Sequence, residues 1–242
     1  MAKPNNPRAV YAVILAGGSG TRLNAPLPKQ FLMLGDAPVF IHSARQLLAD
    51  ARVKQLWVGA NGDWYELARQ QIDEYLPGAR VKMCEGGADR EGTLLNTLGA
   101  ICAYNEVGPE DIALIHDSVR PFVTGRIISD VIREMDACDA CNTVVPVNDT
   151  IVQSADGQAI SGMPARGELF AGQSPQGFKI KPLLAAFASL TPEERRQLTE
   201  TTKVCFMKNI PVHMVRGEFY NFKITTPYDW HVAQNMLEWL GQ

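Results

Sequence analysis

The strongest constraint on this chain is the stretch from Val10 to Gln30, which reads VYAVILAGGSGTRLNAPLPKQ. Its first six residues, Val10–Leu15, form a short apolar run rich in β-branched residues, and glycines follow at once. Such a run predicts a buried β-strand rather than a helix. The glycines at positions 17, 18 and 20 carry no Cβ, so the turn that they form can close its backbone N–H groups around an anion.

Two cations, Arg22 and Lys29, lie just beyond the glycine turn, and together with it they predict a cradle for a polyphosphate. Two other phosphate-binding motifs do not fit. The P-loop template fails because Arg22 stands where its second glycine belongs, and the dinucleotide fingerprint fails because Leu23 replaces its third glycine. A turn that binds no ligand is the alternative, but neither Arg22 nor the Pro28-Lys29-Gln30 triplet is needed to make a turn.

The composition of the chain excludes several classes of protein. With 242 residues, of which 46% are hydrophobic, the chain is long enough to bury a substantial core as one domain. The net charge of −3 and the scattered lysine and arginine residues indicate no nucleic-acid partner. The longest apolar runs are of strand length, well short of the ~20 residues that cross a bilayer, so we expect a cytoplasmic protein with no membrane span.

The five cysteines form an odd number without the spacing of a disulfide framework, which fits a reducing cytoplasm. Cys138 and Cys141 make a C-x-x-C pair, a pattern found in zinc and redox sites. The chain has no second pair, and His213 does not lie at zinc-finger spacing. We therefore interpret these two residues as incidental thiols rather than metal ligands.

Strand and helix patterns alternate after the glycine turn. This alternation predicts an α/β fold with a Rossmann-like, mostly parallel twisted sheet and right-handed crossovers, in which residues 1–242 form a single domain. The further predicted strands are 55–60, 80–84, 111–115, 143–147 and 212–215. The predicted helices are 39–48, 63–75, 89–104, 124–135, 179–190, 191–198 and 228–240.

The motif L-A-G-G-x-G-T-R-[LM], followed by P-K-Q, resembles the nucleotidyltransferases that join a nucleoside triphosphate to a sugar or polyol phosphate. The P-K-Q form is similar to the cytidylyltransferase branch, which contains the methylerythritol-phosphate and ribitol-5-phosphate enzymes. The resemblance implies a glycosyltransferase-A-like fold, CTP as a substrate, and catalytic roles for Arg22 and Lys29 at the α-phosphate. The residues implied to wrap the triphosphate are Leu15, Ala16, Gly17, Gly18, Ser19, Gly20 and Thr21.

A second glycine-rich turn, EGGADREGT at 85–93, follows a predicted strand and opens a predicted helix. By itself it predicts no more than a capped turn. Beside the first motif, it resembles the loop of the same family that binds the base and the ribose. The resemblance places Gly87 and Asp89 near cytosine and Thr93 near the ribose hydroxyls, with Arg90 binding the nucleotide or orienting the loop.

The predicted strand 111–115 delivers the hexapeptide HDSVRP at its carboxyl end, where open α/β sheets bind ligands. A triphosphate brings Mg²⁺, which proteins hold with one or two carboxylates. We therefore expect Asp117 to be a magnesium ligand, and HD-x-x-RP resembles the metal motif of the family, with Ser118 beside the nucleotide. The alternative is an Asp117–Arg120 ion pair with a structural His116.

Asp156-Gly157, between two short extended segments, predicts a β-hairpin arm at 148–168. Such an arm is marginal alone and must pack on something. The resemblance implies a homodimer in which the arm crosses to a second subunit. It also implies that NFKIT at 221–225 brings Lys223, a catalytic residue, to a phosphate. The residues implied to bind the acceptor are Arg120, Asp149, Thr150, Arg166, Ser174 and Lys223.

The identity of the acceptor depends on smaller differences. The methylerythritol enzymes usually carry T-D-E-A-S where this chain has TETTK at 199–203. The motifs GDW, GGADR and GQSPQ resemble the ribitol-5-phosphate branch more closely, which implies CDP-ribitol and pyrophosphate as products and a place in teichoic acid or cell-surface polysaccharide synthesis. The alternatives are methylerythritol 4-phosphate, for isoprenoid synthesis, and a nucleotide-binding regulator that has lost catalysis.

Overall fold

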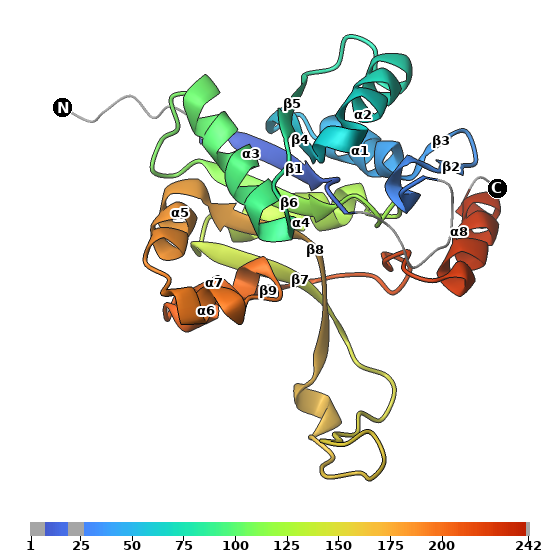
Figure 1. Cartoon of the computed structure of the whole chain (residues 1–242), viewed down its shortest axis with the longest axis vertical. Helices are drawn as coiled ribbons and strands as arrows, with labels where there is room; N and C mark the ends of the chain where they lie inside the picture. The colour runs from blue at the N-terminus through green and yellow to red at the C-terminus, as the bar shows by residue number, and fades with distance from the viewer. Residues whose placement is uncertain (1–7, 19–26, 241–242) are drawn as a thin grey trace.

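The computed structural model describes residues 8–18 and 27–240, and a twisted seven-stranded sheet lies at its centre (Figure 1). The strand order is β5-β4-β1-β6-β8-β7-β9. β8 runs antiparallel to both of its neighbours, and the other described pairs of this sheet are parallel. The strands are β1 (Val10–Leu15), β4 (Val53–Ala60), β5 (Val81–Glu85), β6 (Ile112–Asp117), β7 (Ala140–Pro146), β8 (Phe170–Lys179) and β9 (His213–Arg216). A separate small pair joins β2 (Met33–Leu34) to β3 (Ala37–Pro38).

Helices cover both faces of the sheet, so its central strands are buried on both sides. One face packs against α1 (Val39–Ala49), α2 (Gly62–Tyr75) and α4 (Gly125–Glu134). The other packs against α3 (Arg90–Tyr104), α5 (Ile180–Ala188) and α7 (Thr201–Met207). The remaining helices are α6 (Pro192–Arg196) and α8 (Pro227–Leu240), with short 3₁₀ turns η2 (Lys29–Phe31) and η3 (Arg166–Glu168). Among the described residues, no helix is long and apolar enough to cross a membrane.

The predicted fold class and the predicted strand–helix alternation are confirmed. The main element that the sequence pattern missed is β8, because its GQSPQG segment contains glycine and proline and predicts a turn. Tertiary pairing overrides that local preference, since β8 lies between β6 and β7 and its ladder with β7 shifts register between Asn142 and Val144. The short helix α7 was also missed.

The chain between β7 and β8 leaves the sheet and projects away from it as an arm (Figure 1). The predicted β-hairpin is not confirmed there, because a single antiparallel bridge, Gln153 to Gly162, replaces a ladder. The turn at Asp156-Gly157 is present, with Gly157 at a φ of 72° and the Asp156 carboxylate accepting hydrogen bonds from the backbone N–H groups of Gln158 and Ala159. The arm is therefore held by local turns rather than by a two-stranded sheet.

The order of the strands brings two separated motifs to one edge of the sheet. Leu15, at the end of β1, pairs with Gly59 of β4 on one side and with Asp117 of β6 on the other. These are carboxyl ends of parallel strands, the position at which open α/β sheets bind ligands. The glycine turn after β1 and the HDSVRP segment thus begin side by side.

Candidate functional site

A cleft of about 400 Å³ opens at this carboxyl edge of the sheet. Separated segments of the chain line it, including the glycine turn after β1, the turn η2, the start of α3, the end of β6 and the segment before α8. Its lining residues are Leu15, Gly17, Gly18, Lys29, Gln30, Asn61, Ala88, Asp89, Arg90, Thr93, Asp117, Ser118, Val119 and Lys223.

Asp117 lies at the centre of the charges in this cleft. Its Oδ2 atom is 3.1 Å from Nζ of Lys223 and 3.5 Å from Nε of Arg120, and its Oδ1 atom is 3.4 Å from a guanidinium nitrogen of Arg90. The side chain is 15% exposed. The Asp117–Arg120 ion pair, which the sequence offered as the alternative, is present as the longest of these three contacts. Asp117 also contacts Lys223 and Arg90 and lines the cleft with them, so the ion pair does not exclude a ligand-binding role.

The charges around Asp117 keep it ionised. Burial by itself raises the pKa of its carboxyl group, but the positive charges of Lys223, Arg90 and Arg120 outweigh burial and hold that pKa below its ordinary value of 3.8. Asp117 is therefore a carboxylate with three cations around it, of which Lys223 and Arg90 line the cleft. Such a surface favours an anionic ligand and leaves the carboxylate available to a metal ion.

The glycine turn is fixed by Gln30, a residue to which the sequence analysis gave no role. Its side-chain amide donates hydrogen bonds to the backbone oxygens of Ala16 (2.9 Å) and Gly18 (2.7 Å). On the other side, a Cβ at Gly17 would stand 2.7 Å from Oγ1 of Thr93, so only glycine fits against α3. The P-K-Q triplet thus supplies a positive charge, from Lys29, and the hydrogen bonds that hold the turn, from Gln30.

The predicted phosphate-binding residues on this side lie partly in the cleft. Lys29, in η2, lines it and is only 6% exposed. Leu15, Gly17 and Gly18 also line it, and Ala16 lies buried beneath. The predicted residues Ser19, Gly20, Thr21 and Arg22 lie outside the described residues.

The second glycine-rich turn is built around the hydroxyl of Thr93. This hydroxyl accepts a hydrogen bond from N–H of Gly87 (3.1 Å) and donates one to the backbone oxygen of Asp89 (2.8 Å). Asp89 is the N-cap of α3, since its carboxylate accepts from N–H of Gly92. Thr93 therefore holds the loop in shape, and its predicted contact with a ribose stays a prediction.

Arg90 connects this loop to Asp117 and to α7. Besides its contact with Asp117, its guanidinium donates to Oγ1 of Thr201 at 2.9 Å. The sequence is compatible with Arg90 either binding the nucleotide or orienting the loop, and the structure shows its guanidinium bonded to Asp117 and Thr201 in a residue that lines the cleft.

Behind Asp117, a buried hydrogen-bond chain fixes the end of β6. The Ser174 hydroxyl accepts from N–H of Asp117 (3.1 Å) and contacts Nδ1 of His116 (3.0 Å), while Nε2 of His116 contacts the backbone oxygen of Arg120 (3.1 Å). His116 is fully buried, and burial lowers its pKa to about 4. It is therefore neutral near pH 7, and Ser174, predicted to bind the acceptor, turns its hydroxyl into this chain. Ser118 is 4% exposed and lines the cleft.

Lys223 reaches the cleft because its segment is anchored by Asn221. The Asn221 amide donates to the backbone oxygen of Ser174 (2.8 Å) and to Oε1 of Gln173 (3.2 Å), and Asn221 is fully buried. Its own backbone oxygen accepts from the Arg120 guanidinium at 2.8 Å. Arg120, predicted to bind the acceptor, is thus engaged with the protein and does not line the cleft.

The three predicted acceptor residues of the arm lie apart from this cleft. Asp149, Thr150 and Arg166 are exposed, and none of them lines it. Arg166 donates to the backbone oxygen of Asn148 at 3.1 Å, within the arm itself. Within one subunit the structure does not bring these residues to the other site residues, so their predicted role requires a second chain.

Known proteins match the chain along most of its length. The family model for 2-C-methyl-D-erythritol 4-phosphate cytidylyltransferase, IspD, matches residues 10–239. The chain is 44% identical to the ribitol-5-phosphate cytidylyltransferase of Streptococcus pneumoniae, over 95% of this chain and 99% of that protein. It is 41% identical to the enzyme of the same name from Lactiplantibacillus plantarum, over 95% and 98%.

Solved structures share the fold. The 4-diphosphocytidyl-2C-methyl-D-erythritol synthase of Anaerococcus prevotii superposes with a TM-score of 0.78 at 22% identity, covering 96% of this chain and 99% of that one. The 2-C-methyl-D-erythritol 4-phosphate cytidylyltransferase of Thermus thermophilus gives 0.73 at 25% identity, covering 95% and 99%.

Burial of neutral His116 makes the stability of the protein pH-dependent. Its pKa is about 4 in the folded chain against an ordinary value of 6.5, so between these pH values the unfolded chain binds more protons. The free energy of unfolding should therefore rise with pH across this window, by about 3 kcal/mol from this residue alone. Urea unfolding from pH 4.5 to 7.5 measures the slope.

The matched control for this prediction is His231→Gln, on the exposed part of α8. His116→Gln should flatten the slope below pH 6.5, whereas His231→Gln should leave it unchanged. His213 acts in the opposite direction, because its hydrogen bond with Glu134 raises its pKa. An unchanged slope in His116→Gln would contradict the assignment.

Proposed function

The chain belongs to the 2-C-methyl-D-erythritol 4-phosphate cytidylyltransferase family, and from this premise we propose that it transfers CMP from CTP to D-ribitol 5-phosphate, giving CDP-ribitol and pyrophosphate. The single observation that carries the activity is the convergence of the glycine turn, Lys29, Lys223 and Asp117 on one cleft. A pure nucleotide-binding regulator has less need of this set, so we favour catalysis.

The reaction brings two anions together, because a phosphate oxygen of the acceptor attacks the α-phosphate of CTP in line with the departing pyrophosphate. Catalysis is therefore a matter of positioning and of neutralising charge. The backbone N–H groups of the glycine turn and the ammonium of Lys29 supply donors on the nucleotide side. The nucleophile already lacks a proton, so no general base is required, which agrees with a neutral, buried His116.

Lys223 and Arg90 are the two cations beside Asp117 whose side chains have room to turn. They lie against Asp117, at 3.1 and 3.4 Å. Both side chains are more than one third exposed, so they can turn toward phosphate oxygens without unfolding their segments. We propose that Lys223 leaves Asp117 for the attacking and attacked phosphates, whereas Arg120, which is 11% exposed, stays with Asp117.

The residues of the cleft fit a magnesium ion with one protein ligand. Asp117 is ionised, and the other carboxylate that lines the cleft, Asp89, accepts a hydrogen bond from N–H of Gly92 as the N-cap of α3, so the remaining ligands would be phosphate oxygens and water, as Mg²⁺ favours. When bound, the ion would neutralise charge on the triphosphate. Asp117 would give up part of its contact with Lys223 and Arg90, which frees these cations for the substrates.

The arm is the part of the proposal that requires a second copy. Its exposed apolar side chains Ile151, Val152, Ile160 and Met163 have no cover in one subunit, which favours burial against another chain. We propose a homodimer in which Asp149, Thr150 and Arg166 of one arm complete the acceptor site of the partner. The five free thiols fit a cytoplasmic enzyme, and CDP-ribitol is a precursor suited to teichoic acid or a related polymer.

The acceptor is proposed from the relatives and from one local difference. The relatives at 41–44% identity are named for ribitol 5-phosphate. In this chain Glu200 precedes α7 and lies 3.5 Å from the amide of Gln176, and Thr201 accepts a hydrogen bond from Arg90. Residues 199–201 line an adjoining cavity that shares Asp89 and Arg90 with the cleft. D-ribitol 5-phosphate has an unbranched five-carbon chain, whereas 2-C-methyl-D-erythritol 4-phosphate has a four-carbon chain with a methyl branch, and discrimination over a methyl-sized group is typically ~1–3 kcal/mol, or about 10–200-fold.

A direct assay measures pyrophosphate release from CTP and Mg²⁺ with each acceptor in turn. We expect kcat/KM with D-ribitol 5-phosphate to exceed that with 2-C-methyl-D-erythritol 4-phosphate by about 10-fold or more. The reverse ranking would move the assignment to the isoprenoid enzyme. Nucleotide binding without pyrophosphate release would support the regulator instead.

Lys29→Ala should lower kcat by about 10²–10³-fold, because it removes a donor to the charge that develops in the transition state. Lys181→Ala, at an exposed position of α5, is the matched control and should leave kcat unchanged. Circular dichroism and the unfolding midpoint show whether the fold is intact. Near-normal turnover by the Lys29 variant would remove Lys29 from the mechanism.

The exchange of the arm can be tested by mixing two inactive variants, Lys29→Ala and Arg166→Ala. If Arg166 acts on the partner, one of the two sites in a mixed dimer combines an intact Lys29 with an intact Arg166. We expect mixed dimers to recover roughly half of wild-type activity per dimer, as one complete site of two. No recovery in verified mixed dimers would mean that Arg166 acts within its own subunit or not at all.

A further inference from the structure

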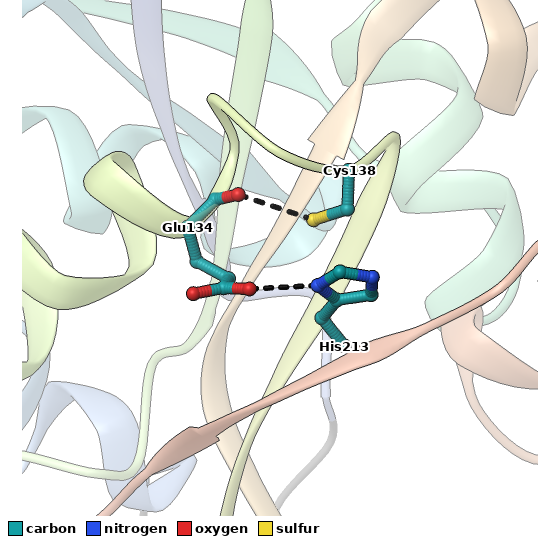
Figure 2. A group of neighbouring side chains, drawn as sticks. All are labelled: Glu134, Cys138 and His213. Atoms are coloured by element: carbon teal, nitrogen blue, oxygen red, sulfur yellow. Dashed lines mark hydrogen bonds and ion pairs between the residues drawn. The ribbon is translucent and has the colours of Figure 1, made fainter.

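A second cluster of reactive side chains consists of Glu134, Cys138 and His213 (Figure 2). It lies at the end of the strands opposite to the cleft. Glu134 is the last residue of α4, Cys138 lies in the turn before β7, and His213 is the first residue of β9. β8 is antiparallel to both β6 and β7, so β7 and its parallel neighbour β9 run in the same direction as β6. Their first residues therefore lie at the end of the sheet opposite to the carboxyl ends that form the cleft. The cluster therefore takes no part in the proposed reaction.

The three side chains point toward one another (Figure 2). Potential ligand atoms of Glu134, Cys138 and His213 all lie within 4.8 Å of one another, and within the described residues no other group of three His, Cys, Asp or Glu side chains meets this condition. Nδ1 of His213 is 2.7 Å from Oε1 of Glu134. The Cys138 thiol donates to the backbone oxygen of Glu134 at 3.3 Å.

The backbone holds these three residues in place without a ligand. N–H of Ala137 donates to the backbone oxygen of Glu134 at 2.9 Å, which shapes the turn that carries Cys138. His213 pairs with Cys141 in the parallel ladder of β7 and β9. The helix that ends at Glu134 is anchored in the core by Ile127, Ile128, Val131 and Ile132. A preformed set of this kind loses little entropy when it binds an ion.

We propose that Glu134, Cys138 and His213 form a binding site for a thiophilic divalent metal ion, with Zn²⁺ as the best match. One sulfur, one imidazole nitrogen and one carboxylate oxygen suit Zn²⁺, whereas Mg²⁺ prefers oxygen ligands alone. Binding releases the thiol proton of Cys138 to solvent, and the proton on Nδ1 of His213 leaves for solvent when the imidazole is protonated and is replaced by one on Nε2 when it is neutral. On a tetrahedral ion, nitrogen and oxygen ligands lie about 3.3 Å apart, so the His213–Glu134 contact opens by less than 1 Å.

Three protein ligands leave one position of a tetrahedral ion for water. The buried Cys141 thiol contacts the Cys138 thiol and lies 3.6 Å from Sδ of Met135, but it is outside the group of ligand atoms that all lie within 4.8 Å of one another. The bound ion would join the end of α4 to the start of β9. β9 leads directly into the segment that carries Lys223. The ion would therefore fix the strand from which that segment begins, at a distance from the reacting groups.

The test uses the full chain, kept reduced with a non-thiol reductant and freed of metal by a chelator. Zn²⁺ is titrated in competition with a chromophoric chelator, and Co²⁺ provides a spectroscopic readout of a thiolate ligand. We expect one Zn²⁺ per chain, a thiolate-to-Co²⁺ charge-transfer band, and a rise in the unfolding midpoint on adding Zn²⁺.

The variants distinguish this site from other thiols and from the cleft. Cys138→Ser and His213→Gln each remove a ligand atom. Loss of a residue that only supports a ligand weakens metal binding by roughly 10–100-fold, so each variant should weaken Zn²⁺ binding by at least that factor. Cys138→Ser should also abolish the charge-transfer band. Cys102→Ser, at an exposed thiol elsewhere, and Asp117→Asn should leave both readouts unchanged. Absence of stoichiometric binding, or equal binding by wild type and Cys138→Ser, would overturn the site and leave an ordinary Glu134–His213 ion pair.

Discussion

One ionised carboxylate at the tip of a buried strand organises this molecule. Asp117 ends β6, in the middle of the sheet, where an unpaired negative charge would be costly. Three cations from three separate segments compensate for it: Arg90 at the start of α3, Arg120 after β6 and Lys223 before α8. The conformations of these segments therefore depend on ion pairs with a single side chain, that of Asp117.

The same arrangement balances its charges within the protein, because the three cations and the carboxylate contact one another. In the proposed reaction, a triphosphate and a metal ion would offer each partner a stronger replacement, because phosphates attract cations and a metal ion attracts a carboxylate. Binding energy would then be used to rearrange charges at the reacting atoms, where it accelerates a reaction between two anions.

Much of the fold and the centre of the site could be predicted from the sequence because their signals are local. A run of buried residues followed by glycines identifies β1 and its turn, and the position of Asp117 at a strand end predicts which edge it faces. The contacts that position these groups are not local. Gln30, Asn221 and Thr201 act through side-chain hydrogen bonds to partners fixed only by the tertiary fold, and no periodic pattern marks them.

Two features that the sequence pattern did not reveal have related causes. β8 contains glycine and proline and predicts a turn, yet its two neighbours in the sheet impose an extended conformation. Cys138 is in contact with Cys141, its neighbour in the sequence, and the fold also places Glu134 and His213 beside it. In both cases residues far apart along the chain decide the outcome, and spacing along the sequence carries no information about them.

The most direct test of the account is a crystal structure of the protein with CTP and Mg²⁺. We predict the triphosphate against the N–H groups of Gly17 and Gly18 and the ammonium of Lys29, with the metal ion on Asp117 and with Lys223 turned from Asp117 toward phosphate. The cytosine should lie beside the loop that contains Gly87 and Asp89. A nucleotide bound elsewhere, or bound in the cleft with the Lys223–Asp117 contact intact and no metal on Asp117, would contradict the central claim.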